Sequence, residues 1–318
     1  MKRGSAIFLG PVALLIAMVS AGCGGKSSTS PSTSSTTDQA QVASVLASAT
    51  TLTDDGLAED PSRVAASALG PATQLRGELS DPNATDAFIR PFAWWQNVTQ
   101  ITPTWTLAFA DTDATGRPNT CIATLTKHMT GSLIVIPASP TDTTQADSAH
   151  TVVKPLDKTL TRRIKLSRLM IGSERLWKVV QVTGAFVSTV SPQTSIVSLH
   201  ITSSSGVDTT IVDPLQWFSL RHVLKFGTLD TVTVVVTTTR TNDPVFIHRW
   251  DWRHRLRNNL DGTYSFTWVT SAWGGWRWFG IQAMSHASLY DDTLPFDMEA
   301  WHFPFRVVGG QPDVDCYP

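Results

Sequence analysis

The sequence predicts an α+β domain of helices and an antiparallel sheet, followed by an all-β sandwich. Three observations indicate this order. Apolar residues recur at helical spacing in much of residues 38–98. They then alternate at every second position along several stretches up to residue 190. From residue 191 onward, about seven short strand patterns are separated by closely spaced turn signals.

Composition sets the outer limits of the prediction. A chain of 318 residues with 42% hydrophobic residues is long enough for two domains after removal of a leader. Aspartates greatly outnumber glutamates, and threonine and valine are frequent, which favours strands and turns. The formal net charge is −1, so no overall positive field attracts nucleic acid.

Residues 1–22 have the features of an export signal. Lys2 and Arg3 precede an apolar stretch, residues 6–19, that is only 14 residues long. A membrane-spanning helix needs roughly 20 residues, whereas a secretory signal does not. The stretch ends in Ser20-Ala21-Gly22-Cys23, which resembles the lipobox of bacterial lipoproteins.

The lipobox resemblance implies that the signal is cleaved before Cys23 and that this cysteine is acylated. The protein would then be attached to a membrane through this lipid, and Gly24 implies the outer membrane of a bacterial cell envelope. Ser20 stands where leucine is commoner, and an ordinary signal peptide with a chance cysteine is the alternative. Residues 23–37, rich in serine and threonine, predict a flexible tether.

Export would place the two remaining cysteines, Cys121 and Cys316, in an oxidising compartment. Disulfides persist there, so the pair predicts a bond between the first domain and the C-terminal tail. Two unpaired thiols are the alternative.

Residues 38–190 predict the first domain. We expect helices at 38–50 and 60–69, and a third from Thr85 or Asp86 through Trp95. Strands are expected at 105–109, 121–130, 132–136, 160–169 and 176–190. The strand at 160–169 is expected to have a basic face formed by Arg163 and Lys165.

This order of elements resembles the cone-shaped fold of nuclear-transport-factor-like proteins, which implies a curved sheet around a cavity. Some proteins of that fold are enzymes, so an enzyme is one alternative function. Its cavity would be lined by Trp94, Trp95, Trp105 and Trp177, with Asp111 or His128 as the acid or base. All three tyrosines lie outside this region, which argues against ketosteroid-isomerase-like chemistry.

Residues 191–318 predict an immunoglobulin-like sandwich from the number and spacing of their strands. Residues 249–257 read as one strand, with Trp250, Trp252 and His254 inward and the arginines outward. Asp261-Gly262 predicts the turn to the next strand. Residues 276–290 and 300–308 supply two more strand candidates.

No motif of a serine hydrolase, zinc peptidase or nucleotide-binding protein occurs, so neither cofactor nor metal ligands are predicted. Residues 191–318 carry 9 Lys and Arg against 12 Asp and Glu, which argues against nucleic acid as a partner. The tryptophans Trp273, Trp276 and Trp278 flank two glycines and could stack on a glycan; packing in the core is the alternative. We therefore expect an exported, lipid-anchored, non-catalytic binding module whose partner is a glycan or another envelope protein.

Overall fold

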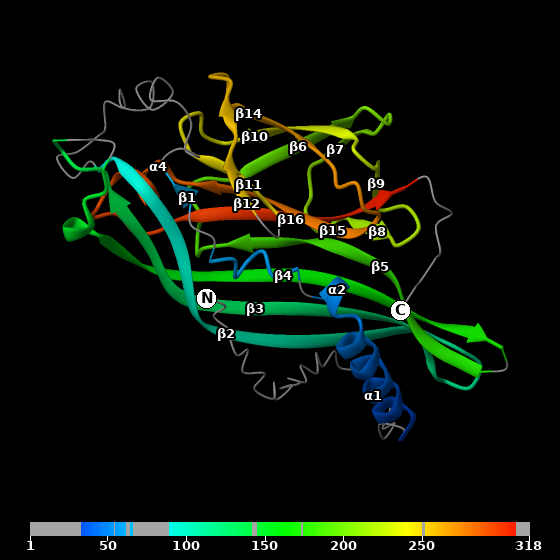
Figure 1. The fold of residues 1–318 in the computed structure, drawn as a ribbon. Coiled ribbons are helices and arrows are strands. Elements are labelled where there is room, and N and C mark those ends of the chain that lie inside the picture. Colours follow the sequence, from blue (N-terminus) through cyan, green and yellow to red (C-terminus); the bar gives the residue numbers. More distant parts are fainter. Residues whose placement is uncertain are drawn as a thin grey trace, which may run out of the picture.

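The computed structural model describes residues 33–53, 55–61, 64–65, 89–141, 145–172, 174–249 and 252–309. In these ranges the chain is mostly antiparallel β-sheet with few helices, as the strand patterns predicted (Figure 1). The predicted signal peptide, Cys23 and Cys316 lie outside the described residues.

The helical elements are α1 (Thr33–Ser48), α2 (Thr50–Thr53), the 3-10 helix η2 (Ser148–His150) and α4 (His286–Tyr290). The strands of the larger sheet are β1 (Val64–Ala65), β2 (Pro91–Thr112), β3 (Pro118–Pro137), β4 (Val152–Ile171), β5 (Glu174–Ser188), β8 (Trp217–Ser219), β9 (Leu224–Gly227), β11 (Val245–Arg249), β12 (Trp252–Arg255), β15 (Gly275–Met284) and β16 (Met298–Val308). The smaller sheet contains β6 (Ile196–Ser203), β7 (Asp208–Ile211), β10 (Thr231–Thr238), β13 (Arg257–Asn258) and β14 (Thr263–Val269).

The larger sheet has the order β1-β2-β3-β4-β5-β16-β15-β11-β12, with β8 beside β5 and β9 beside β16. Its strands β2, β3 and β4 each contain 20 residues or more. Along β4 nearly every second side chain is buried, so one face of the sheet packs against the protein. We call this face the inner face.

A bend in β2 and β3 gives the larger sheet its curvature (Figure 1). The register of β2 against β3 shifts between Val98 and Gln100, which is the mark of a β-bulge. Gly131 of β3 faces this bulge, and a Cβ there would lie only 2.0 Å from the carbonyl oxygen of Asn97. Glycine is therefore needed for the two backbones to approach so closely.

The smaller sheet packs on β9, β11, β15 and β16 and forms a β-sandwich with them. Buried valines of β10 meet Phe279 of β15 and Phe303 and Phe305 of β16 in one apolar cluster. Tyr264 and Trp268 of β14 belong to the same cluster. The predicted sandwich is thus present as two packed sheets, and four of its strands continue into the larger sheet.

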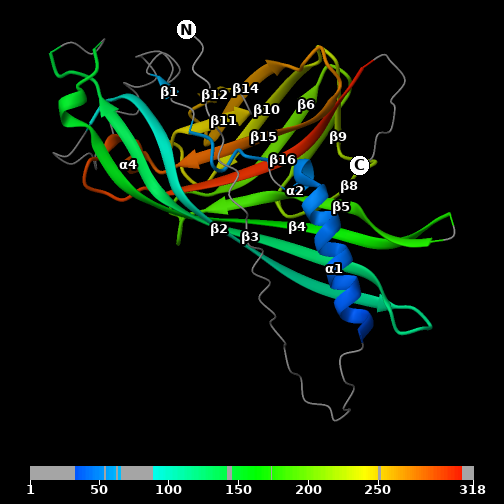
Figure 2. The same ribbon diagram turned by 60° about the horizontal axis from the view of Figure 1, so that its bottom comes forward.

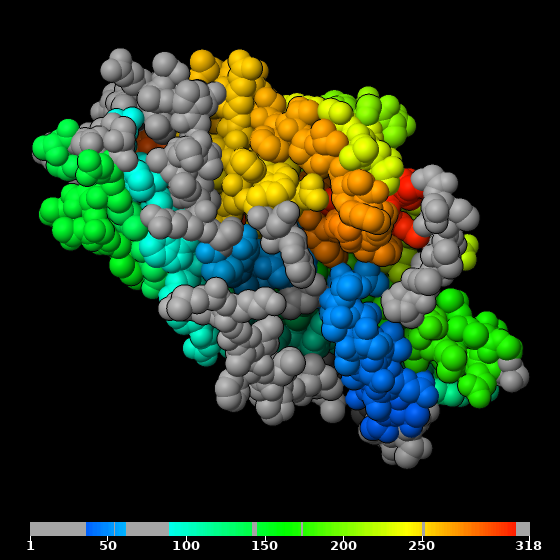
Figure 3. All heavy atoms as spheres, viewed as in Figure 1, coloured from blue at the N-terminus to red at the C-terminus, as the bar shows by residue number. Residues whose placement is uncertain are grey.

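Helices α1 and α2 lie across the inner face of β3, β4 and β5 (Figure 2). Val42 and Leu46 of α1 and Leu52 of α2 pack there on Ile164 and Trp177. The helix predicted at 38–50 is confirmed, but it begins earlier, at Thr33, within the predicted tether. Residues 55–61 continue from α2 over the same face, and we call them the strap. Figure 3 shows α1 and the lighter blue residues after it on one side of the molecule.

Two helix predictions for the first domain need correction. The helix predicted at 60–69 is wrong where the structure describes this stretch, because residues 64–65 form β1 and pair with β2. The helix predicted through Trp95 is wrong, because β2 begins at Pro91 and Trp94 and Trp95 pair with β3. The bulky apolar residues of this stretch are compatible with a helix or a strand, and pairing with β3 selects the strand. The sheet is also continuous across residue 190, since β5 pairs with both β8 and β16.

The single strand predicted at residues 249–257 is wrong. The chain reverses there, and β11 pairs with β12 so that His248 faces Arg253 and Phe246 faces Arg255. Cross-strand partners point to the same side of a sheet. Arg253 and Arg255 are therefore buried with the apolar residues of β11 instead of pointing outward.

The predicted strand at residues 276–290 ends earlier than expected. Met284 is the last residue of β15, and helix α4 follows.

Candidate functional site

Basic side chains occupy buried positions of the inner face of β4, between leucine and isoleucine residues. These positions are Lys154, Lys158, Arg162 and Arg168. The predicted basic face of Arg163 and Lys165 is the opposite, partly exposed side of the same strand. A buried charge is costly unless it is paired, so the segment that covers this face must supply partners.

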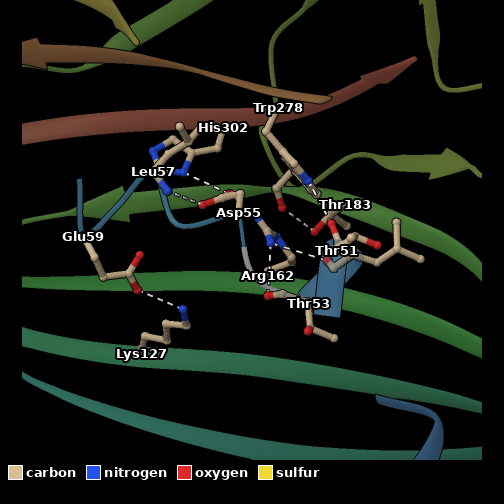
Figure 4. A network of polar contacts seen from close by, with 12 residues as sticks. Thr51, Thr53, Asp55, Leu57, Glu59, Lys127, Arg162, Thr183, Trp278 and His302 are labelled. Atoms are coloured by element: carbon tan, nitrogen blue, oxygen red, sulfur yellow. Dashed lines mark hydrogen bonds and ion pairs between the residues drawn. The ribbon is translucent and has the colours of Figure 1, made fainter. Parts of the chain in front are cut away.

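Asp55 of the strap lies between Arg162 of β4 and His302 of β16 (Figure 4). Its carboxylate forms an ion pair with the Arg162 guanidinium, and both side chains are only 1% exposed. The same carboxylate oxygen lies 3.2 Å from Nδ1 of His302, and the other accepts the Leu57 N–H at 2.9 Å. Burial raises the pKa of Asp55, but Arg162, His302 and these hydrogen bonds hold it well below its usual value.

Arg162 joins the sheet to α2 and β15 as well as to the strap. Its Nη1 donates to the carbonyl oxygens of Leu52 and Thr53 at 3.4 and 3.1 Å. Its guanidinium lies 4.1 Å from the centre of the Trp278 ring. Trp278 Nε1 in turn donates to the carbonyl oxygen of Thr51 at 2.9 Å, so this ring is held at its face and its edge.

Two lysines hold the middle of the strap (Figure 4 shows the first). Lys127 of β3 forms an ion pair with Glu59 at 2.8 Å. Lys158 donates to the carbonyl oxygen of Ala58 at 2.5 Å and to Oε1 of Gln96. Burial and the nearby Arg253 charge lower the pKa of Lys158 to about 7, although Glu59 and Asp60 oppose this shift.

The far end of the strap meets Arg253 of β12. Its Nη2 lies 3.6 Å from the Asp60 carboxylate, and its guanidinium lies 4.9 Å from the centre of the Trp94 ring. Burial lowers the pKa of Arg253 to about 10. The neighbouring His248 stacks edge-on against His302, and burial and the Arg253 charge keep its pKa well below the usual value.

Helix α1 is fastened in the same way. Asp38 accepts from Arg117 Nη2 at 2.6 Å and from Trp177 Nε1 at 3.2 Å, and Arg168 Nη1 lies 3.9 Å away. Each carboxylate in the described part of residues 33–61 therefore contacts a basic side chain of the sheet. These carboxylates are Asp38, Asp55, Glu59 and Asp60.

Several buried polar atoms of this network have no hydrogen-bond partner, including the acceptor Oε2 of Glu59 among the described residues. In the described part of the chain, Nε of Arg162, Nε and Nη1 of Arg253 and both ring nitrogens of His248 have no hydrogen-bond partner. Asp55 is the sole hydrogen-bond partner of the His302 ring among these residues, so no hydroxyl or thiol is aligned with it as a nucleophile. The arrangement holds a segment of chain in place, and the described residues around His302 form no complete catalytic triad.

The three candidate tryptophans occupy different environments. Trp273 lies in the turn before β15 and is 78% exposed. Trp276 and Trp278 are half-buried and pack against the cluster beneath α1 and α2. The structure therefore leaves one of these rings open to solvent and engages the other two in packing.

The structure brings the residues of the predicted enzyme cavity together only in part, because Trp105 packs against both the cluster of Trp94 and the cluster of Trp177. Trp94 and Trp177 are buried in separate apolar clusters, Trp94 against Phe246 and Trp177 against Phe109. His128 is exposed on the outer side of β3, where it pairs with Asp157 at 2.7 Å. Asp111 is also exposed, and it accepts the Thr120 hydroxyl at 2.6 Å.

Cys121 is completely buried in the cluster under α1. Burial raises the pKa of its thiol to about 12. No disulfide of Cys121 forms within the described residues, and Cys316 lies outside them, so the bond between them stays a prediction.

Comparisons with protein families, curated proteins and solved structures find no match for this chain. Among the described residues, no cluster of three or more His, Cys, Asp or Glu side chains could bind a metal ion. No helix in the same residues has the length and apolar character needed to cross a membrane.

Proposed function

We propose that this protein is an exported, lipid-anchored and non-catalytic binding module of the bacterial cell envelope. The observation that carries the proposal is the attachment of the N-terminal segment to the sheet. Cys23 lies ten residues before Thr33, the first residue of α1. All four carboxylates described between Thr33 and Pro61 then contact basic residues of the inner face.

This attachment suits a protein held by its N-terminus. Ten residues span at most roughly 35 Å when fully extended, so the folded body would stay close to the lipid that holds it. Force on the anchor would be carried through α1 and the strap into the long strands. On this proposal the outer membrane is the location, and the sandwich, for which we propose an immunoglobulin-like architecture, faces the partner.

Replacing Cys23 by serine is expected to abolish acylation, because serine has no thiol to carry the lipid. The mature, acylated form should disappear from the membrane fraction, and the chain should be released or accumulate as an uncleaved precursor. Mass spectrometry of the N-terminal peptide after cell fractionation measures both outcomes. Cys316→Ser, which leaves the lipobox intact, is the matched control. A Cys23→Ser chain with wild-type mass in the membrane fraction would refute the anchor.

A glycan is the second candidate ligand, and the exposure of Trp273 favours it. Aromatic rings at secreted β-sandwich surfaces can stack on sugar rings, and this indole is the candidate tryptophan that is open to solvent. Trp273→Ala is expected to change the free energy of unfolding by less than about 0.5 kcal/mol. It should also abolish binding on a glycan array.

Trp278→Ala is the matched comparison. This ring contacts Arg162 and Thr51, so its loss is expected to lower stability by roughly 2–3 kcal/mol, somewhat less than for a fully buried tryptophan. Thermal melts of both variants beside the array provide the measurement. An array on which the wild-type protein binds nothing would remove the glycan from consideration.

A further inference from the structure

The hairpin between β4 and β5 ends in apolar side chains that face solvent. Leu169, Met170, Ile171 and Leu176 are between 38% and 59% exposed. Figure 1 shows this green hairpin extending beyond the sandwich at the right of the view, and Figure 2 shows the same projection after rotation. Apolar residues scattered singly on a surface need no explanation, but four at one projecting tip do.

Strand pairing places a definite pattern on the outer side of this hairpin, the side opposite Arg168. Leu169 pairs with Leu176 at the tip, and Ser167 pairs with Lys178 one step behind. Side chains two positions apart share a face, so Lys165 also lies on this side. The lysines are therefore roughly 7 and 13 Å behind the leucine pair, at about 3.3 Å per residue.

The charges near the tip favour an anionic partner. Lys165 and Lys178 form no ion pair with any of the residues that the structure describes. Glu174 and Arg175 at the tip itself have opposite charges, and Arg175 pairs with Asp113 at 3.0 Å. The apolar tip would reach the acyl chains of a lipid surface, and the lysines behind it would then lie at the level of the anionic headgroups.

The tip also lies at the same end of the molecule as the start of α1. Arg168, directly before Leu169, is 3.9 Å from Asp38 of α1, and Arg117 of the adjacent β2–β3 turn contacts the same carboxylate. Asp38 is five residues from Thr33, which is about 7.5 Å along a helix. An anchor at Cys23 would therefore leave the hairpin tip within reach of the lipid surface that holds the anchor.

We propose that the β4–β5 hairpin is a second membrane contact, in which Leu169, Met170, Ile171 and Leu176 enter the interfacial region and Lys165 and Lys178 bind anionic phospholipid headgroups. The inference rests on the proposed anchoring at Cys23, which brings the chain to a membrane. Two contacts would fix the orientation of the body, whereas a single tether leaves it free to rotate.

The test uses the acylated mature chain, which begins at Cys23, in vesicles of phosphatidylethanolamine and phosphatidylglycerol. Hydrogen exchange of residues 169–176 is expected to be about tenfold slower than in a variant that carries Met170→Glu and Ile171→Glu, because two carboxylates oppose insertion. Val190→Glu is the matched control, since Val190 is 84% exposed and lies beyond the opposite end of β5. It should retain the slow exchange.

Lipid composition gives the second comparison. In vesicles of phosphatidylcholine alone the hairpin should exchange faster than with phosphatidylglycerol, and Lys178→Glu should remove this difference. Equal exchange in the wild-type chain and the double variant would overturn the proposal and assign the tip to a protein partner.

The same samples also test the proposed acylation at Cys23 independently of the hairpin. The mass of the N-terminal peptide reports acylation at Cys23. If the chain is not acylated, the proposed anchor fails alone, and the hairpin is then tested by cosedimentation with the same vesicles. The wild-type and Val190→Glu chains should cosediment about tenfold more strongly than the double variant, and equal cosedimentation would overturn the hairpin contact.

Discussion

Replacing Asp55 by alanine is expected to lower the free energy of unfolding by roughly 3–5 kcal/mol, the cost of removing one partner from a buried ion pair. Arg162 and His302 are each about 1% exposed and would lose the carboxylate between them. The N–H of Leu57 would lose its acceptor too. Nε of Arg162 already lacks a partner within the described structure, so no spare acceptor compensates. Denaturant unfolding of the full chain at pH 7 measures the change.

Asp157→Ala is the matched control for this experiment. Asp157 also pairs with a histidine, His128, but both side chains are at least half exposed, so the loss should stay below about 1 kcal/mol. A double variant with Asp55→Leu and Arg162→Met should recover part of the stability, because it removes both charges from the interior. Equal losses for Asp55→Ala and Asp157→Ala would contradict a buried, compensating role for Asp55.

The sequence predicted the strands of the long sheet well, because alternation is a local signal. Residues 121–130, 160–169 and 176–190 were expected as strands and fall mostly within β3, β4 and β5. It did not predict that β5 would pair with β16, more than 100 residues later. Strand pairing over such a distance leaves no local trace, so the sequence predicts a boundary at residue 190, where the sheet continues.

A strand reversal that contains neither glycine nor proline also leaves no turn signal in the sequence. Residues 245–257 contain neither, and the alternation of aromatic and basic residues continues across the reversal. A hairpin brings His248 opposite Arg253, which places the arginine inside. The pattern therefore predicts one half-buried strand with outward arginines, whereas the chain forms two strands there.

The polar network was detectable in part. Lys158 lies two residues before Leu160 and Arg162 two residues after it, so these basic side chains share the apolar face of one strand. A basic side chain at a core position requires a partner, so this pattern indicates a polar network on the inner face. The partner itself could not be found, because Asp55 is 107 residues from Arg162.

Lys158 is expected to make the stability of this protein rise with pH above neutrality. Its pKa is about 7 in the folded chain, lowered by burial and by Arg253, against an ordinary value of 10.5. Between these two values the unfolded chain binds a proton that the folded chain does not, so stability increases as pH rises. Below about pH 7 both states are protonated and the penalty for burying the charge is complete. From pH 7 to pH 9 the gain is roughly 2–3 kcal/mol, at about 1.4 kcal/mol per pH unit.

Other groups titrate in the same range, so the measurement is a difference between variants. Lys154, with a pKa lowered to about 8 by burial, adds to the rise, whereas the buried thiol of Cys121 opposes it above about pH 9.

Lys158→Met keeps the length of the side chain and has no charge to bury. The stability of the wild-type chain relative to this variant should therefore increase by roughly 2–3 kcal/mol between pH 7 and pH 9. Lys165→Met, on the opposite face of β4, should leave the slope unchanged. Parallel curves for the wild-type and Lys158→Met chains would show that the lysine keeps its proton under the strap, and that the strap does not exclude solvent from it.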